Sequence, residues 1–104
     1  MKYLSRPEEW ILLAVWRAKE NAYGVQIRRE VMEMTGIYWS VGAIYVPLDR
    51  LEDKGFLRSR LADPTPARGG KSKRFYELTA DGLAQLEEIR KIYRYVWKDM
   101  PEFR

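Results

Sequence analysis

The sequence predicts a mainly α-helical domain with one small two-stranded β-hairpin, in the order three helices, hairpin, helix. Apolar residues recur at helical spacing in three stretches before residue 55 and again after residue 79. Between them, two short extended segments, 56–61 and 74–79, flank a turn rich in glycine, proline and basic residues. A helix followed by a hairpin with a cationic tip is the arrangement of a winged helix-turn-helix domain. Such a domain presents one helix to a DNA groove, so we expect DNA binding.

Length and composition narrow the class of protein. With 104 residues, 46% of them hydrophobic, the chain has room for one domain with one core. It lacks both an apolar run long enough to span a membrane and the apolar core of a signal peptide, so we expect a cytoplasmic protein. Cysteine and histidine are both absent, which removes the usual catalytic nucleophiles, bases and metal ligands. We therefore expect no enzyme, no metal and no cofactor.

The positive charge is concentrated in one segment. The net charge is +4, yet residues 58–74 alone carry six basic residues and one acidic residue. Charge gathered in a short segment creates a local field, which suits phosphate binding at the tip of a hairpin. The alternative is a solvated loop that only keeps the protein soluble.

The first helix is expected from a capping box. Ser5 precedes Glu8 by three residues, with proline in the first turn, and the helix should run to about Lys19. Its tryptophans are assigned to the core by default, and we place Trp10 and Leu13 on the buried face. Trp16 or Arg17 would lie near the same face.

The second and third helices form the expected helix-turn-helix. The second begins near Tyr23 and ends before Gly36, with Val25, Ile27 and Val31 on its buried side. Ser40 is a good N-cap for the third helix. That helix should bury three residues spaced four and three apart, namely Ile44, Leu48 and Leu51. Pro47 lies inside it, so we expect a bend or a loosened first turn.

The hairpin and the last helix complete the chain. Leu57 and Leu61 should face inward on the first strand, and Thr79 should cap a helix at 80–99. An apolar seam runs along this helix and widens at Trp97; its members are Leu86, Ile89, Tyr93, Val96 and Met100. We expect residues 1–79 to form the DNA-binding domain and residues 80–104 a dimerisation helix in the same compact unit. The alternative is that the seam folds back on the first helix.

Five stretches in the same order and spacing resemble the PadR family of bacterial transcriptional regulators. They are YGVQI at 23–27, WSVGAIY at 39–45, LDRLEDKGFL at 48–57, RGGK at 68–71 and YELTADG at 76–82. Each stretch alone is common among winged helices, but together they are specific. The family often has proline directly after the tyrosine of the second stretch, whereas here Val46 intervenes and the proline is Pro47.

The resemblance implies a homodimeric repressor that binds a palindromic operator in double-stranded DNA. Its third helix would enter the major groove, its wing would touch the backbone and its C-terminal helix would dimerise. The DNA-contacting positions that the resemblance implies are Tyr23, Ser40, Gly42 and Tyr45, with Lys71, Lys73 and Arg74 on the wing. For Tyr45, burial is the alternative. Some members of the family bind planar aromatic effectors between subunits, so Trp97 is a candidate ligand-binding residue, with ordinary interface packing as the alternative.

Two arginines have competing interpretations. Arg28 follows the head of the second helix, where a helix-turn-helix crosses the DNA backbone, so we expect it to contact phosphate. Arg50 could read guanine, but we favour pairing with Glu52, Asp53 or Glu77. The rival function for the whole chain is a winged-helix module that binds another protein instead of DNA; the acidic residues of the third helix favour it, and the cationic wing opposes it.

Overall fold

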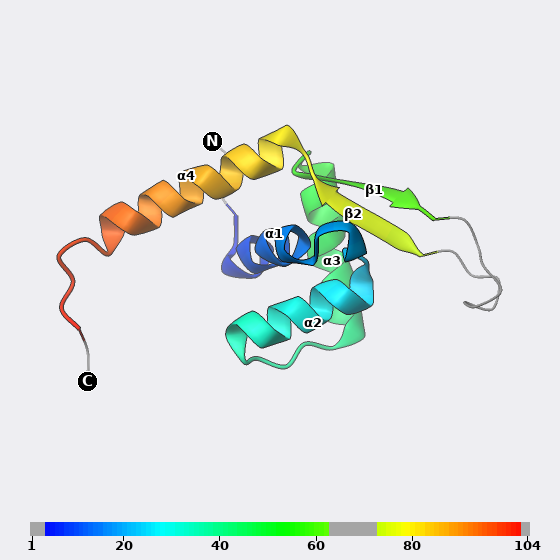
Figure 1. Ribbon diagram of the computed structural model, residues 1–104, viewed down its shortest axis with the longest axis horizontal. Coiled ribbons are helices and arrows are strands. Elements are labelled where there is room, and N and C mark those ends of the chain that lie inside the picture. The colour runs from blue at the N-terminus through cyan, green and yellow to red at the C-terminus, as the bar shows by residue number, and fades with distance from the viewer. Residues whose placement is uncertain (1–3, 63–72, 103–104) are drawn as a thin grey trace.

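A computed structural model describes residues 4–62 and 73–102 of the chain, and its described part has the expected order of elements (Figure 1). The helices are α1 (Arg6–Ala18), α2 (Gly24–Thr35), α3 (Val41–Asp53) and α4 (Ala80–Val96), with a short 3-10 turn, η1 (Lys19–Asn21), after α1. The strands β1 (Leu57–Leu61) and β2 (Arg74–Leu78) pair antiparallel. The predicted mainly α fold with one hairpin is confirmed.

The predicted helix caps are confirmed because they depend on local sequence. Ser5 accepts from the amide of Glu8, whose side chain accepts from the Ser5 amide, which completes the capping box. Ser40 and Thr79 cap α3 and α4 with their hydroxyls. Gly36 ends α2 at φ +70°, a conformation that few residues other than glycine adopt readily.

The core lies where α1, α2 and α3 meet the hairpin. Its fully buried side chains include Ile11, Leu12, Val15, Ile27, Val31, Ile44, Leu48, Leu51 and Leu57. The predicted buried face of α3 is thus confirmed, and α3 remains helical through Pro47. Trp39 is also buried and anchors the connector that leads into α3.

Three expected core positions are wrong. Leu13 and Trp16 are exposed, because α1 turns Ile11, Leu12 and Val15 inward instead. The segment 10–16 is apolar almost all round, so its composition does not fix which side is buried. Val25 is exposed because it lies about 200° around α2 from the buried Ile27.

The end of β1 also departs from expectation, since Leu61 is exposed beyond the last core contact of the hairpin.

The start of α2 lies beside the hairpin. Tyr23 forms an isolated bridge with Phe75, and the Tyr76 amide donates to the Ala22 carbonyl at 2.8 Å. This bridge fixes the first turn of α2 against the wing.

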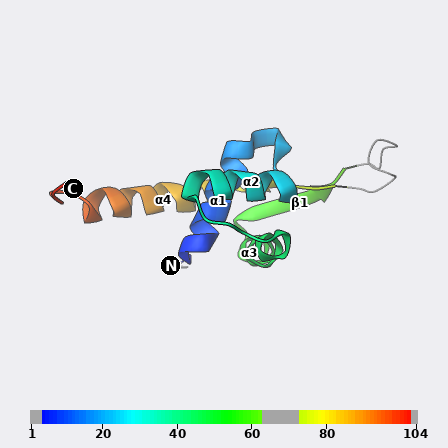
Figure 2. The same ribbon diagram turned by 90° about the horizontal axis from the view of Figure 1, so that it is seen from below.

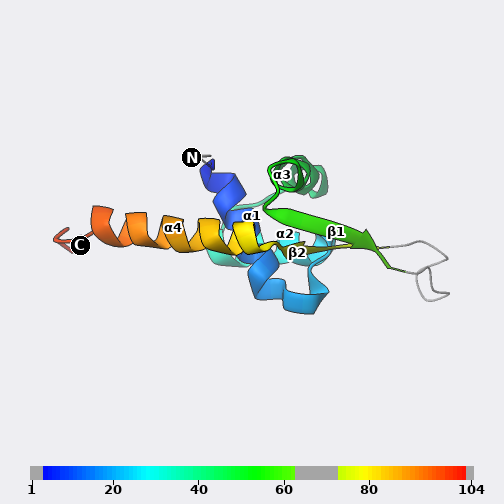
Figure 3. The same ribbon diagram turned by 90° about the horizontal axis from the view of Figure 1, so that it is seen from above.

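Figure 1 shows α4 leaving the body of the molecule, with its C-terminal half extending well beyond α1. Its first turn is held closely, because a Cβ added to Gly82 would collide with the Phe56 carbonyl oxygen. Seen along the perpendicular directions, α3 and the blue turn between α1 and α2 lie on opposite sides of the hairpin (Figures 2 and 3). None of the helices described is long and apolar enough to cross a bilayer.

Candidate nucleic-acid interface

The outer face of α3 is open to solvent. Gly42, Val46, Asp49 and Asp53 recur at spacings of three and four, opposite the buried face, and all are exposed. Viewed end-on in Figure 2, α3 forms one edge of the molecule, and no other element covers its outer side. A helix held by its inner face alone can enter a groove of DNA.

The first turn of α3 combines a fixed cap with an uncrowded backbone. The Ser40 hydroxyl accepts from the Ala43 amide at 3.2 Å, so it stabilises the start of the helix. A Cβ added to Gly42 would meet no atom within 4 Å. Glycine weakens a helix, and no contact inside the described part of the chain requires one at this position.

Tyr45 joins α3 to the start of α2. Its side chain is 43% exposed, and its ring lies against Gly24. A Cβ at Gly24 would come within 2.5 Å of the phenol oxygen, so the ring needs a glycine there. The Tyr45 hydroxyl is thus placed beside the N-terminus of α2.

The N-terminus of α2 is a donor-rich corner. Tyr23 is its N-cap and makes no side-chain capping hydrogen bond, which leaves the first-turn amides without a side-chain partner. The Tyr23 ring packs edge-on against Phe75, with centroids 5.6 Å apart, and Lys73 Nζ lies 3.9 Å from the Tyr23 ring centroid. Helix-terminal amides next to a cation favour an anion such as a phosphate.

Arg28 and Arg50 differ in the contacts that they make within the chain. Arg28 donates from Nε to the Trp39 carbonyl at 2.6 Å and lies over the Tyr38 ring, so it braces the connector before α3. Arg50 forms no ion pair with any residue in the described ranges, so the expected pairing is wrong.

Two of the three carboxylates expected to bind Arg50 have other partners. Glu77 binds Arg58, while Glu52 accepts from the Ser59 hydroxyl. Arg50 therefore remains exposed on the same helix as Val46.

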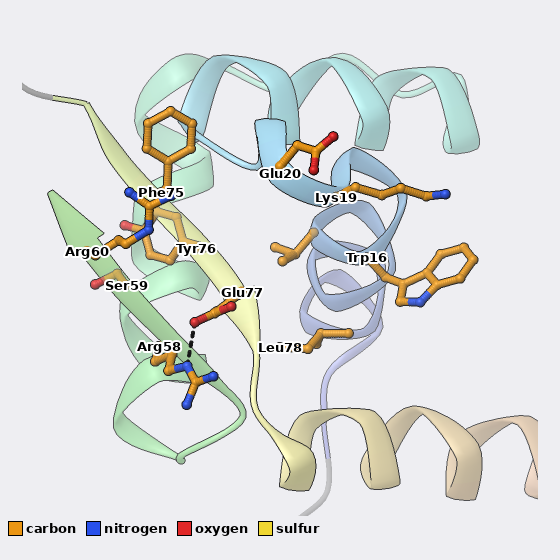
Figure 4. Close-up of a pocket in the computed structure, with 11 residues that line it drawn as sticks. Trp16, Lys19, Glu20, Arg58, Ser59, Arg60, Phe75, Tyr76, Glu77 and Leu78 are labelled. Carbon is orange, nitrogen blue, oxygen red and sulfur yellow. Dashed lines mark hydrogen bonds and ion pairs between the residues drawn. The ribbon is translucent and has the colours of Figure 1, made fainter. Parts of the chain in front are cut away.

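The cationic residues of the wing divide between its two faces. Arg74 donates to Ser59, which donates to Glu52 on α3, so Arg74 lies on the α3 side. Arg58 and Arg60 alternate with Ser59 and therefore point to the opposite side, toward the hollow shown in Figure 4. There Arg58 pairs with Glu77 at 2.6 Å (Figure 4).

Arg60 on that opposite face lies over the Phe75 ring, 5.2 Å from its centroid. The expected phosphate contact Lys71, together with Arg68, lies outside the described residues. Of the wing cations that the structure does describe, Lys73 and Arg74 are the two nearest to α2 and α3 by their contacts.

A groove of about 750 Å³ separates α1 from α4. Tyr93 donates to Glu9 across it at 2.7 Å; this hydrogen bond, with partial burial and the charge of Glu9, raises the pKa of Tyr93. Leu86, Ile89 and Tyr93 are half-buried along it, whereas Val96 and Trp97 are exposed, Trp97 by 61%. The first half of the apolar seam thus packs against α1 of the same chain, and the second half is uncovered.

Neither a metal centre nor a membrane-spanning element accompanies this surface in the described ranges. No group of three acidic side chains there is arranged to hold a metal ion. The surface instead combines an exposed helix, an adjacent helix N-terminus and two wing cations. This combination defines a winged helix-turn-helix DNA-binding protein.

Comparison with known proteins gives the family. Residues 12–88 match the transcriptional regulator PadR-like family, so the chain belongs to that family. It is a family of transcription regulators and not of enzymes, and its members bind DNA. No curated protein sequence matches the chain.

Solved structures share the fold. A PadR family transcription regulator from hypervirulent Clostridium difficile has a TM-score of 0.74 at 23% identity, covering 92% of this chain and 95% of that one. A PadR-like regulator from Bacillus cereus has a TM-score of 0.69 at 26% identity, covering 86% and 82%. A winged-helix DNA-binding protein from STIV has a TM-score of 0.69 at 22% identity, covering 94% and 98%.

Proposed function

We propose that this chain is a sequence-specific, homodimeric transcriptional repressor in the cytoplasm, and that it binds a palindromic operator. The observation that carries the proposal is the arrangement around α3: its outer face is uncovered, and its inner edge lies beside an uncapped helix N-terminus. The exposed face also carries Gly42 in its first turn, a glycine that no contact inside the described part of the chain requires. Membership of a family of DNA-binding regulators supports the same conclusion.

In the proposed complex, α3 lies in the major groove and the start of α2 meets the phosphate backbone. Tyr45 lies against Gly24 and Lys73 lies over the ring of Tyr23, the N-cap of α2, so one phosphate at the first amides of α2 would receive backbone, phenol and ammonium donors. Ser40 and Gly42 begin the groove-facing turn. Arg74, together with Lys71, extends the contact along the backbone.

Dimerisation would cover the free end of α4. Val96, Trp97 and Met100 are exposed on one chain, and the α1–α4 groove offers Leu13 and Trp16. Burying these side chains against a second copy removes a large apolar surface from water. Two domains related by a two-fold axis then address half-sites about one helical turn apart, roughly 10 bp between centres.

A small planar aromatic effector bound in the same groove would release the repressor from its operator. Trp10, Trp16 and Trp97 line it, and flat indole surfaces suit stacking on a planar ligand. Binding there would change how α4 lies against α1, and therefore the spacing of the two α3 helices.

Fluorescence anisotropy with labelled random-sequence duplexes at two salt concentrations tests DNA binding. If each subunit neutralises about six phosphates, affinity should fall at least a thousandfold between about 50 and 200 mM salt. Lys73→Glu should weaken binding to every sequence similarly, because a phosphate contact carries no sequence information. Tyr45→Ala should also change which sequence is preferred, because it removes the contact with Gly24 that fixes α3 relative to α2. Absence of binding at low salt would instead support the protein-binding module.

A further inference from the structure

We propose that this chain reads its operator through apolar contact, with Val46 touching the 5-methyl group of a thymine in each half-site. The inference rests on the proposed function, since it assumes that α3 enters the major groove. It adds the class of base that is read and the residue that reads it.

The acidic residues of α3 determine which part of the helix enters the major groove. Asp49 and Asp53 are both exposed on the outer face, in the C-terminal half of the helix. Carboxylates placed between two phosphate backbones are repelled, so this half must tilt away from the DNA. The N-terminal half, from Val41 to Val46, is the part that can approach the base edges.

That N-terminal half offers no free side chain of the kind that makes bidentate hydrogen bonds. Ser40 is engaged as the cap, and Tyr45 is packed against Gly24 toward α2. The remaining exposed residues on its surface are Val41, Gly42, Ala43 and Val46. Guanine and adenine are usually read by arginine, lysine, asparagine or glutamine, none of which is present between 40 and 46.

Val46 is the apolar side chain that points most directly outward. It lies about 200° around the helix from the buried Ile44, and it is 54% exposed. Gly42, one turn earlier on the same face, lacks a side chain and has open space around it, so the helix can approach closely there. The methyl group of thymine is the apolar feature that the major groove presents to such a surface.

Val41 provides a matched control. It is exposed by the same fraction, 54%, but it lies only about 60° from the buried direction of the helix. Val41→Ala and Val46→Ala remove the same atoms from one helix. Because both side chains are exposed, both variants should remain folded, which a circular-dichroism melt checks.

The test uses the full chain and its preferred duplex, selected from random DNA. Each thymine is replaced singly by uracil, which removes only the 5-methyl group. The transfer free energy of one methyl corresponds to about a fourfold change in affinity, so replacement in both half-sites should weaken binding about fifteenfold. In Val46→Ala the same replacement should matter less than about twofold, whereas Val41→Ala should keep the full effect.

Two results would overturn the inference alone. One is a wild-type protein that tolerates uracil at every position while base-pair changes abolish binding, since Asp49 or Arg50 would then read the site. The other is uracil sensitivity that persists in Val46→Ala. Failure to bind any duplex at low salt would overturn the proposed function as well, so the two failures are distinguishable.

Discussion

Replacing Gly42 by alanine should make the protein more stable and a poorer DNA binder. Gly42 is the second residue of α3, and an added Cβ would meet no atom within 4 Å. Alanine is favoured over glycine in a helix by up to about 1 kcal/mol, and about half of this is expected in the first turn. For a domain of this size, that gain corresponds to a rise in Tm of roughly 2–4 °C.

The same methyl group should obstruct DNA. If the α3 backbone approaches base edges at Gly42, the added methyl must displace it, and affinity should fall on the order of tenfold. Thermal unfolding followed at 222 nm and anisotropy with the preferred duplex measure the two effects. Gly55→Ala is the matched control: it also has open space, but its φ of +82° makes alanine strained.

Gly55→Ala should therefore lose about 1 kcal/mol of stability while keeping the DNA affinity of the folded protein. A Gly42→Ala variant that lost stability, or one that gained stability and bound DNA as tightly as the wild type, would contradict the close approach of α3 at Gly42.

Two further predictions concern the packing of the fold, and a third concerns the proposed dimer. Gly82→Ala should destabilise the protein by more than about 3 kcal/mol in urea unfolding, because its methyl would collide with the Phe56 carbonyl; a loss below 1 kcal/mol would contradict the close contact. Burial raises the pKa of Glu8, but hydrogen bonds from Lys54 and Ser5 outweigh it and leave the pKa below its ordinary value. The ionised Glu8 therefore stabilises the folded state above pH 4.5, and this stabilisation is lost as the pH falls through the lowered pKa. Glu8→Gln should therefore lose about 2 kcal/mol at pH 7 and less at acidic pH; an equal loss at both would refute the ion pair's role. Trp97→Ala should raise the dissociation constant of the proposed dimer in analytical ultracentrifugation at least tenfold without unfolding α4, and an unchanged value would place the interface elsewhere.

Local features of the sequence predicted the boundaries of the elements well. Ser5, Ser40 and Thr79 cap helices because a hydroxyl needs only the amides of the following turn. The buried face of α3 was also predictable, since Ile44, Leu48 and Leu51 recur four and three residues apart and the charged Asp49, Arg50 and Asp53 lie elsewhere on the helix. Nothing beyond neighbouring residues is needed for such predictions.

Features that depend on distant segments were missed. The segment 10–16 is apolar on most sides, so only the position of α2 and α3 decides that Trp16 faces outward. The hydrogen bond from Arg28 to the Trp39 carbonyl and the contact of Tyr45 with Gly24 each join residues on different elements. A glycine followed later by an exposed tyrosine carries no signal that the two will meet. Which wing cations face α3 likewise depends on strand register.

The most direct test of the account is an amide NMR titration of the ¹⁵N-labelled protein with its preferred duplex. The largest shifts are expected at residues 23–26, 40–46 and 73–74, which are the start of α2, the N-terminal half of α3 and the adjoining end of β2. Shifts concentrated instead around Lys19, Arg58 and Arg60, on the opposite face, with residues 40–46 unchanged, would contradict it.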